Sequence, residues 1–114
     1  MKVFVTGVNG QLGYDVVRTL VECGHCVVGS DITEEYSGIL SADINYIKLD
    51  ITNAKSAEFV ISLVSPDAVI HCAAWTAVDL AEEKENIEKV REINAGGARN
   101  IALACKKLDC KMVY

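Results

Sequence analysis

Three glycines recur at every third position, Gly7, Gly10 and Gly13, within residues 6–13. This run directly follows the apolar residues 3–5 and directly precedes a segment in which apolar residues have helical spacing. A strand, a glycine-rich turn and the start of a helix together present backbone N–H groups to a phosphate. The glycines permit a tight turn, close approach of a pyrophosphate and close packing of the helix. Glycines that only punctuate a turn have the same spacing, so other residues must support the phosphate interpretation.

Asp31 follows the next apolar run, 18 residues after Gly13. A carboxylate at about this distance accepts hydrogen bonds from the ribose hydroxyls of an adenosine. It would also repel a 2′-phosphate, and neither Ile32 nor Thr33 adds a positive charge. The glycines and Asp31 therefore predict a site for NAD(H) or NADP(H), with charge favouring NADH. An exposed turn aspartate is the alternative.

Two later apolar runs also end in residues suited to such a ligand. Asp50 could accept a hydrogen bond from the adenine amino group while Ile51 covers the ring, or Asp50 could cap the following helix. After His71, the small residues Ala73 and Ala74 would let a ligand lie against the main chain. We interpret His71 as a satisfied, partly buried histidine rather than a catalytic group.

Asn94 is a polar residue on the apolar face of the last predicted helix. The other members of that face are Val90, Gly97, Ile101, Ala104 and Leu108. A buried amide costs free energy unless it is paired, so we expect Asn94 to bond to backbone or ordered water beside the cofactor loop. The glycines at 96 and 97 each cost a helix about 1 kcal/mol, which predicts close packing against the sheet or the preceding loop.

The elements that position these residues alternate between strand and helix. Strands are predicted at 1–6, 26–29, 45–49, 68–71 and 111–114, and helices at 11–23, 54–64 and from about 80 or 83 to 108. The first helix is expected to bury Leu12, Val16, Val17 and Leu20, and the second to bury Ala57, Val60, Ile61 and Val64. Thr52 or Asn53 can cap the second helix. Right-handed βαβ crossovers then give a doubly wound parallel sheet in the order 3-2-1-4-5, a three-layer α/β/α Rossmann domain spanning residues 1–114. Its ligand site lies at the carboxyl ends of strands one and four.

Composition excludes several classes of function. The net charge of −5 argues against nucleic acid as the main partner. No apolar run approaches the ~18 residues that span a bilayer, and no signal peptide is recognisable. Five cysteines without a secretory signal indicate free thiols in a reducing, cytoplasmic compartment.

The pair Cys23 and Cys26 has C-x-x-C spacing, which can belong to a redox or zinc site. It follows a predicted helix that Gly24 ends, where the helix dipole disfavours a thiolate. No further ligand pair completes a zinc site. We therefore predict no metal and rank a thiol redox function last. The other three cysteines, Cys72, Cys105 and Cys110, are expected to be small core residues.

The T-G-x-x-G-x-x-G loop, the acid after the second strand and the Asp-Ile after the third resemble those of the extended short-chain dehydrogenases/reductases. Within that superfamily, residues 10–13 (G-Q-L-G) and 73–82 (A-A-W-T-A-V-D-L-A-E) are similar to the dTDP-4-dehydrorhamnose reductases, and the resemblance covers the whole chain. Those enzymes reduce the 4-keto group of dTDP-6-deoxy-L-lyxo-4-hexulose to give dTDP-L-rhamnose.

The resemblance implies a set of cofactor contacts on this chain. They are Gly10, Gln11, Leu12, Asp31, Asp50, Ile51, Ala73, Ala74, Trp75 and Thr76. Val78 would lie near the sugar-nucleotide substrate. Members of the family often accept both NADH and NADPH, which weakens the charge argument from Asp31. Trp75 replaces the smaller aromatic residue or histidine common in the family.

The superfamily's catalytic Ser or Thr and Tyr-x-x-x-Lys are not found in these residues, and Tyr114 is the last residue. We therefore expect no catalytic residue here, an inactive isolated chain, and a longer parent reductase with a C-terminal substrate-binding part. Two alternatives stay open: a non-catalytic dinucleotide-binding regulatory subunit, and another sugar-nucleotide epimerase or dehydratase of the superfamily. An uncovered fifth strand would favour self-association, for example as a homodimer.

Overall fold

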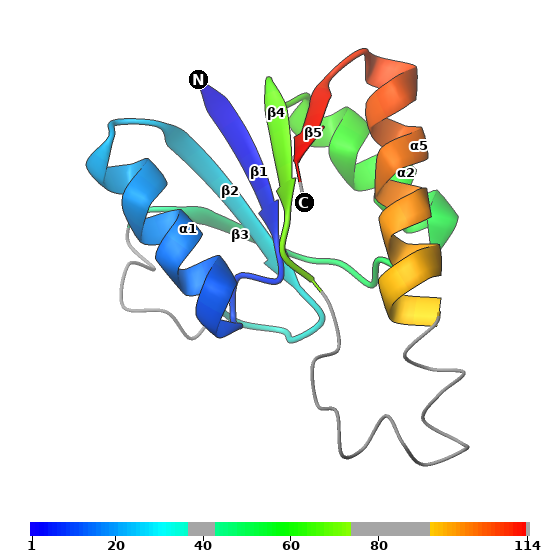
Figure 1. Ribbon diagram of the computed structural model, residues 1–114, viewed down its shortest axis with the longest axis horizontal. Helices are drawn as coiled ribbons and strands as arrows, with labels where there is room; N and C mark the ends of the chain where they lie inside the picture. Colours follow the sequence, from blue (N-terminus) through cyan, green and yellow to red (C-terminus); the bar gives the residue numbers. More distant parts are fainter. Residues whose placement is uncertain (37–42, 74–91, 114) are drawn as a thin grey trace.

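The computed structural model describes residues 1–36, 43–73 and 92–113, which form a parallel sheet with helices on both faces (Figure 1). The strands are β1 (Lys2–Thr6), β2 (Cys26–Asp31), β3 (Asn45–Lys48), β4 (Ala68–His71) and β5 (Lys111–Val113). The helices are α1 (Gln11–Glu22), α2 (Ala54–Val64), the π-helical η1 (Glu92–Gly97) and α5 (Ala98–Leu108). The strand order is β3-β2-β1-β4-β5, as the sequence predicted.

Alternate residues of β1 divide the core into two halves. Val3 and Val5 face α1 in one buried cluster, whereas Phe4 belongs to the cluster that packs against α2 and α5. Strands buried on both faces need apolar residues at every position, which explains the continuous run in β1. Figure 1 shows α1 on one side of the sheet and α2 with α5 on the other. All strand pairs are parallel, so their carboxyl ends meet at one edge.

The helix α2 forms where the sequence predicted it, and its ends have local causes. The Asn53 side chain accepts a hydrogen bond from the Ser56 N–H at 3.1 Å, so Asn53 rather than Thr52 is the N-cap. Ser65 ends the helix in the left-handed conformation, with φ of 48°. The four predicted core residues of α2 are buried: Ala57, Val60, Ile61 and Val64.

Helix α1 differs from the prediction at its first turn. Val17 is fully buried and Val16 and Leu20 are partly buried, but Leu12 is 63% exposed. Leu12 lies in the turn that follows the glycine loop, where the helix begins at the carboxyl edge of the sheet. Gly13, not Leu12, is the buried residue of this turn, and it packs against the backbone of Gly7 and Val8. The predicted apolar stripe therefore begins one turn later.

Asn94 is exposed, so the prediction that it is a buried amide was wrong. The reason is that η1 is a π-helical segment with i→i+5 hydrogen bonds, to which the 3.6-residue spacing used for Asn94 does not apply. From Gly97 onward the predicted face is recovered, since Gly97, Ile101 and Ala104 are buried. Leu108 is 36% exposed, and Val90 lies outside the described residues.

The two glycines of η1 have different surroundings. A Cβ on Gly97 would lie 2.5 Å from Ile51 Cδ1, whereas a Cβ on Gly96 would meet no atom of the described residues within 4 Å. The sequence predicted close packing of the pair against the sheet or the preceding loop; the structure shows close packing only at Gly97, and against Ile51 in the loop after β3. Three residues after Gly97, the half-buried Asn100 donates from Nδ2 to the Ile51 carbonyl at 2.9 Å. Asn100 therefore makes the kind of amide-to-backbone bond predicted for Asn94.

The free thiols divide between the surface and the core. Cys23 and Cys26 are exposed at the α1–β2 connection, and Gly24 ends α1 with φ of 82°, as predicted. Cys105 is buried, while Cys72 and Cys110 are partly buried against the two core clusters. No group of side chains in the described ranges could hold a metal ion. Within the same ranges, no helix is long and apolar enough to cross a membrane.

Candidate dinucleotide-binding site

Two of the three predicted glycines are required by the packing of the chain itself. Gly7 has φ of 71°, and a Cβ there would lie 2.6 Å from the Ala73 nitrogen. A Cβ on Gly13 would lie 2.1 Å from the Gly7 carbonyl oxygen. The glycine loop therefore lies directly against the backbone that follows β4 and against the first turn of α1, with no space for a side chain at Gly7 or Gly13. Gly7 and Gly13 thus let β1, the loop and α1 approach one another.

Gly10 is different, because nothing in the described structure requires a glycine there. It is exposed, its φ of −81° and ψ of 166° suit any residue, and a Cβ would meet only the Gly7 oxygen at 3.4 Å. Gly10 is also the N-cap of α1, and because glycine has no side chain, no cap hydrogen bond is made to the first turn of the helix. The first N–H groups of a helix lack partners within the helix. A phosphate fits this arrangement, since a bare N-cap lets it approach those N–H groups and the positive end of the helix dipole.

Asp31 connects the end of β2 to the glycine loop. Its Oδ2 accepts a hydrogen bond from the Asn9 N–H at 3.0 Å, and its Oδ1 accepts one from the Ile32 N–H at 2.8 Å. The side chain of Asn9 reaches the same turn by donating to Thr33 Oγ1 at 2.7 Å. Asp31 is partly exposed, and its contact with a ribose stays a prediction. Each carboxylate oxygen can accept a further bond, which leaves acceptor capacity for a ribose hydroxyl.

Asp50 forms a local turn before α2. Its Oδ1 accepts hydrogen bonds from the Thr52 N–H at 3.0 Å and from the Thr52 hydroxyl at 2.6 Å. It therefore leads into the helix without capping it, since the cap is Asn53. Ile51 is 7% exposed and packs at Gly97. Adenine contacts by Asp50 and Ile51 stay predictions.

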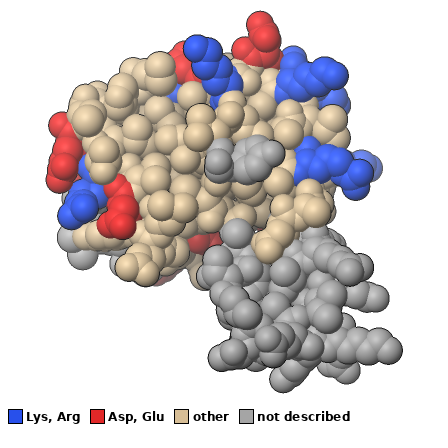
Figure 2. Space-filling model, viewed as in Figure 1, with Lys and Arg blue, Asp and Glu red and all other residues tan. Residues whose placement is uncertain are grey.

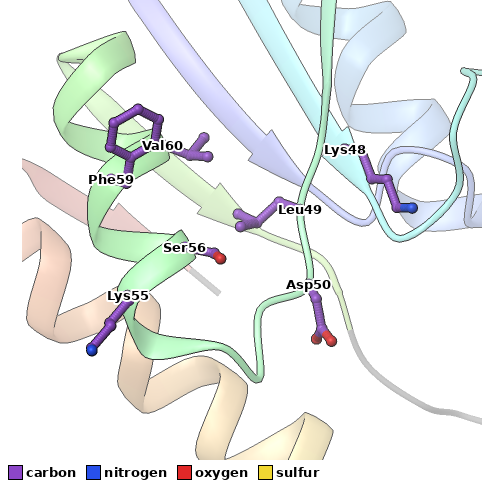
Figure 3. Close-up of a pocket in the computed structure, with 7 residues that line it drawn as sticks. All are labelled: Lys48, Leu49, Asp50, Lys55, Ser56, Phe59 and Val60. Carbon is purple, nitrogen blue, oxygen red and sulfur yellow. The ribbon is translucent and has the colours of Figure 1, made fainter.

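A pocket of about 380 Å³ lies between the segment after β3 and α2 (Figure 3). Its lining residues are Lys48, Leu49, Asp50, Lys55, Ser56, Phe59 and Val60. Lys48 forms an ion pair with Glu34. Only Asp50 belongs to the predicted cofactor contacts, so this pocket is not the predicted dinucleotide site. Its lining comes from two segments with no shared sequence motif, and the sequence offered no signal for it.

Thr6 is a site residue to which sequence reasoning assigned no role. Its Oγ1 accepts hydrogen bonds from the N–H groups of Cys72 at 3.1 Å and Ala73 at 3.2 Å, and it lies 2.7 Å from His71 Nδ1. Two N–H bonds occupy the acceptor capacity of a hydroxyl, so the Thr6 proton is donated to Nδ1. One fully buried hydroxyl therefore joins the end of β1 to the loop after β4 and holds Nδ1 unprotonated. The sequence signal that could have indicated this role is the Thr6-Gly7 pair at the end of the first strand.

His71 is 8% exposed, and burial lowers the pKa of its imidazole. It is a neutral, hydrogen-bonded residue of the sheet edge, in agreement with its interpretation as a satisfied histidine. Of the predicted cofactor and substrate contacts that follow His71, the structure describes only the first. Ala73 is described and donates to Thr6, whereas Ala74, Trp75, Thr76 and Val78 lie outside the described residues.

The depressed pKa of His71 predicts a loss of stability in mild acid. Above the unfolded-state pKa of about 6.5, both states hold a neutral ring and the folded protein keeps its full stability. As the pH falls below that value, the unfolded chain binds a proton first, so the unfolding free energy drops by up to about 1.4 kcal/mol per pH unit until the folded pKa is passed. Urea unfolding at pH 7.5 and 5.5 measures this loss.

His71→Asn is the matched variant for that measurement. An asparagine keeps an acceptor for the Thr6 hydroxyl but does not titrate. We expect the loss of unfolding free energy between pH 7.5 and 5.5 to be smaller in the variant, because the rest of the protein is unchanged. An identical loss in the two proteins would refute the assignment of the pH dependence to His71.

Charged residues are distributed around the rim of one face of the molecule (Figure 2). Basic and acidic residues both occur there, and the surface between them is mostly uncharged.

Comparison with known proteins agrees with this geometry. The family model of the RmlD substrate binding domain matches residues 1–114. A probable low-salt glycan biosynthesis reductase of Haloferax volcanii is 37% identical and aligns with 100% of this chain and 36% of its own length.

Two solved structures share the fold. dTDP-4-dehydrorhamnose reductase of Bacillus anthracis in complex with NADP is 34% identical, with a TM-score of 0.75 over 99% of this chain and 35% of that one. UDP-glucose 4-epimerase of Thermus thermophilus in complex with NAD is 25% identical, with a TM-score of 0.88 over 100% of this chain and 37% of that one. The chain thus spans about a third of the length of these proteins. It belongs to the RmlD substrate binding domain family, and its predicted resemblance to the extended short-chain dehydrogenases/reductases is confirmed.

Proposed function

We propose that this chain binds NAD(H) or NADP(H) as the cofactor-binding part of a sugar-nucleotide oxidoreductase. The observation that carries the proposal is the bare N-cap at Gly10 beside the carboxylate of Asp31. The first suits a pyrophosphate and the second suits the ribose of an adenosine. The complexes of the two solved relatives with NADP and NAD support the same ligand class.

The reaction we propose for the whole protein is reduction of the 4-keto group of dTDP-4-dehydro-L-rhamnose to give dTDP-L-rhamnose. Support comes from the family match and from the relatives named as reductases. The bound cofactor supplies a hydride to the carbonyl carbon. The residues of this chain hold the pyrophosphate at the start of α1 and orient the ribose at Asp31. Catalytic side chains would come from outside these 114 residues.

A second candidate is a sugar-nucleotide epimerase. It is favoured by one observation, the TM-score of 0.88 with UDP-glucose 4-epimerase against 0.75 with the reductase. Sequence identity points the other way, at 25% against 34%. Turnover assays of the longer protein with the 4-keto sugar nucleotide and with UDP-glucose separate the two reactions. Dinucleotide binding without turnover of either substrate would favour a regulatory subunit.

Calorimetric titration of the chain with NADH and NADPH tests the binding proposal. We expect both to bind, NADH more tightly because Asp31 repels a 2′-phosphate. Gly10→Ala is expected to lower the NADH affinity at least tenfold, since its methyl group stands where the pyrophosphate must approach. Its unfolding free energy should change by about 1 kcal/mol or less, because only the Gly7 oxygen lies near the new Cβ.

Gly96→Ala is the control for this titration, because it adds the same methyl group where no atom of the described part of the chain lies within 4 Å. It should bind NADH like the original chain. Equal NADH affinity of Gly10→Ala and the original chain would overturn the placement of the pyrophosphate. No binding of either dinucleotide would overturn the proposed function of this chain.

Self-association stays a prediction. It is supported by the position of β5 at the edge of the sheet and by Val113, which is 58% exposed there. Sedimentation velocity measures the oligomeric state directly.

A further inference from the structure

The end of α5 turns into β5 through a Schellman motif. Asp109 has φ of 55°, the Cys110 N–H donates to the Cys105 carbonyl at 3.0 Å, and the Asp109 N–H donates to the Lys106 carbonyl at 3.2 Å. These are the 6→1 and 5→2 bonds that define the motif. The motif also brings together two side chains, those of the residues joined by the 6→1 bond. In this chain both of those residues are cysteines.

The backbone places the two cysteines side by side. The Cys110 N–H bonds to the Cys105 carbonyl, and both residues pack with the core between the sheet and helices α2 and α5. Cys105 is 3% exposed, whereas Cys110 is only partly buried. Two thiols are therefore held at this junction by backbone hydrogen bonds, and one of the two residues is partly exposed.

We propose that Cys105 and Cys110 form a redox-sensitive dithiol, which a low-molecular-weight disulfide such as oxidised glutathione converts into an intramolecular disulfide. The dithiol is separate from the dinucleotide site. It lies where α5 enters β5, at the amino edge of the sheet, while the glycine loop lies at the carboxyl edge (Figure 1).

Oxidation proceeds in two thiol–disulfide exchanges. The Cys110 thiol loses its proton and its sulfur attacks oxidised glutathione, which forms a mixed disulfide and releases one glutathione thiolate. Burial raises the pKa of Cys105 to about 12, so this thiol acts second. It loses its proton, attacks the Cys110 sulfur, forms the Cys105–Cys110 bond and releases the second glutathione. Two protein thiols and one small disulfide thus become one protein disulfide and two small thiols, which carry the two protons.

The disulfide would tie the last turn of α5 to the residue before β5. A short loop closed in this way restricts the unfolded chain, and we expect the Tm to rise by about 5 °C. Amide hydrogen exchange of Lys111–Val113 should slow, because β5 can no longer separate from the end of α5.

The experiment uses the full chain with Cys23→Ser and Cys26→Ser, because these exposed thiols would compete for the oxidant. The folded protein is treated with oxidised glutathione, and its intact mass and its disulfide-linked peptides are determined. We expect the loss of two hydrogens without a glutathione adduct, and a Cys105–Cys110 link. Adding Cys105→Ser should instead trap one glutathione on Cys110, and adding Cys110→Ser should abolish the intramolecular disulfide.

Three results would overturn the proposal. They are an unreacted protein, a stable glutathione adduct with Cys105 present, and a link that involves Cys72. If Cys105→Ser unfolds, the folded Cys110→Ser variant still decides which thiol attacks first, since it should form no glutathione adduct on Cys105. No dinucleotide is used, so the outcome does not depend on the proposed function.

Discussion

Replacing Gly13 with alanine is expected to lower the unfolding free energy by about 3 kcal/mol or more. The new Cβ would lie 2.1 Å from the Gly7 oxygen and 2.8 Å from the Gly7 carbonyl carbon and Val8 Cα. All three are backbone atoms, so no side-chain rotation relieves the overlap. The first turn of α1 must then move away from the glycine loop. Urea unfolding followed by circular dichroism measures the loss.

Gly96→Ala is the matched control, since it makes the same chemical change in a helical residue. A Cβ on Gly96 meets none of the described atoms within 4 Å. Alanine at such a position restricts the unfolded chain and is expected to stabilise the protein by about 0.4–1 kcal/mol. The two substitutions should therefore have opposite signs. A Gly13→Ala variant as stable as the original would mean that α1 does not pack on the loop as described.

Replacing Thr6 with valine is expected to cost about 3 kcal/mol. Valine has the shape of threonine but no hydroxyl, and Thr6 is 0% exposed. The Ala73 N–H loses its acceptor and His71 Nδ1 loses the Thr6 hydroxyl, whereas the Cys72 N–H keeps the Thr6 carbonyl at 3.2 Å. Each unsatisfied buried polar group costs about 1–3 kcal/mol. Because Ala73 adjoins the glycine loop, NADH affinity should fall as well.

Thr19→Val separates the loss of a hydroxyl from the loss of this network. The Thr19 hydroxyl donates to the Asp15 carbonyl at 2.9 Å on an exposed part of α1. Water can replace that bond, so we expect a change within about 0.5 kcal/mol. Thr6→Ser keeps the hydroxyl and should retain more stability than Thr6→Val. Equal stability of the Thr6→Val and Thr19→Val proteins would argue against the three-bond role of Thr6.

The elements that the sequence predicted well have local causes. Helix α2 was predicted from Ala54 to Val64, the range that the structure shows, because a cap residue precedes it and Pro66 follows it. The strand Ala68–His71 was likewise predicted at its observed ends. Apolar spacing within each element and the rule of right-handed crossovers are sufficient to give the order 3-2-1-4-5.

The errors arose because the 3.6-residue spacing of an α-helix was used to predict burial at helix ends, where that spacing does not decide which residues are buried. Leu12 was placed on the buried stripe of α1, but the first turn of this helix lies at the sheet edge. Asn94 was placed on a buried face by α-helical spacing, and the π-helical η1 changes that register. Asn100, only six residues later, is half-buried and donates to a backbone carbonyl.

The sequence by itself determined the parallel sheet, the position of the glycine loop and the acidic residue at the end of β2, because these depend on spacing along the chain. Only the tertiary structure decided that Gly7 and Gly13 serve the packing of the protein, while a Cβ on Gly10 would meet only the Gly7 oxygen. It also decided that the Thr6 hydroxyl joins β1 to the loop after β4. The reason is distance along the chain: the Thr6 contacts join residues 65 to 67 positions apart, and no local pattern specifies which atoms meet there.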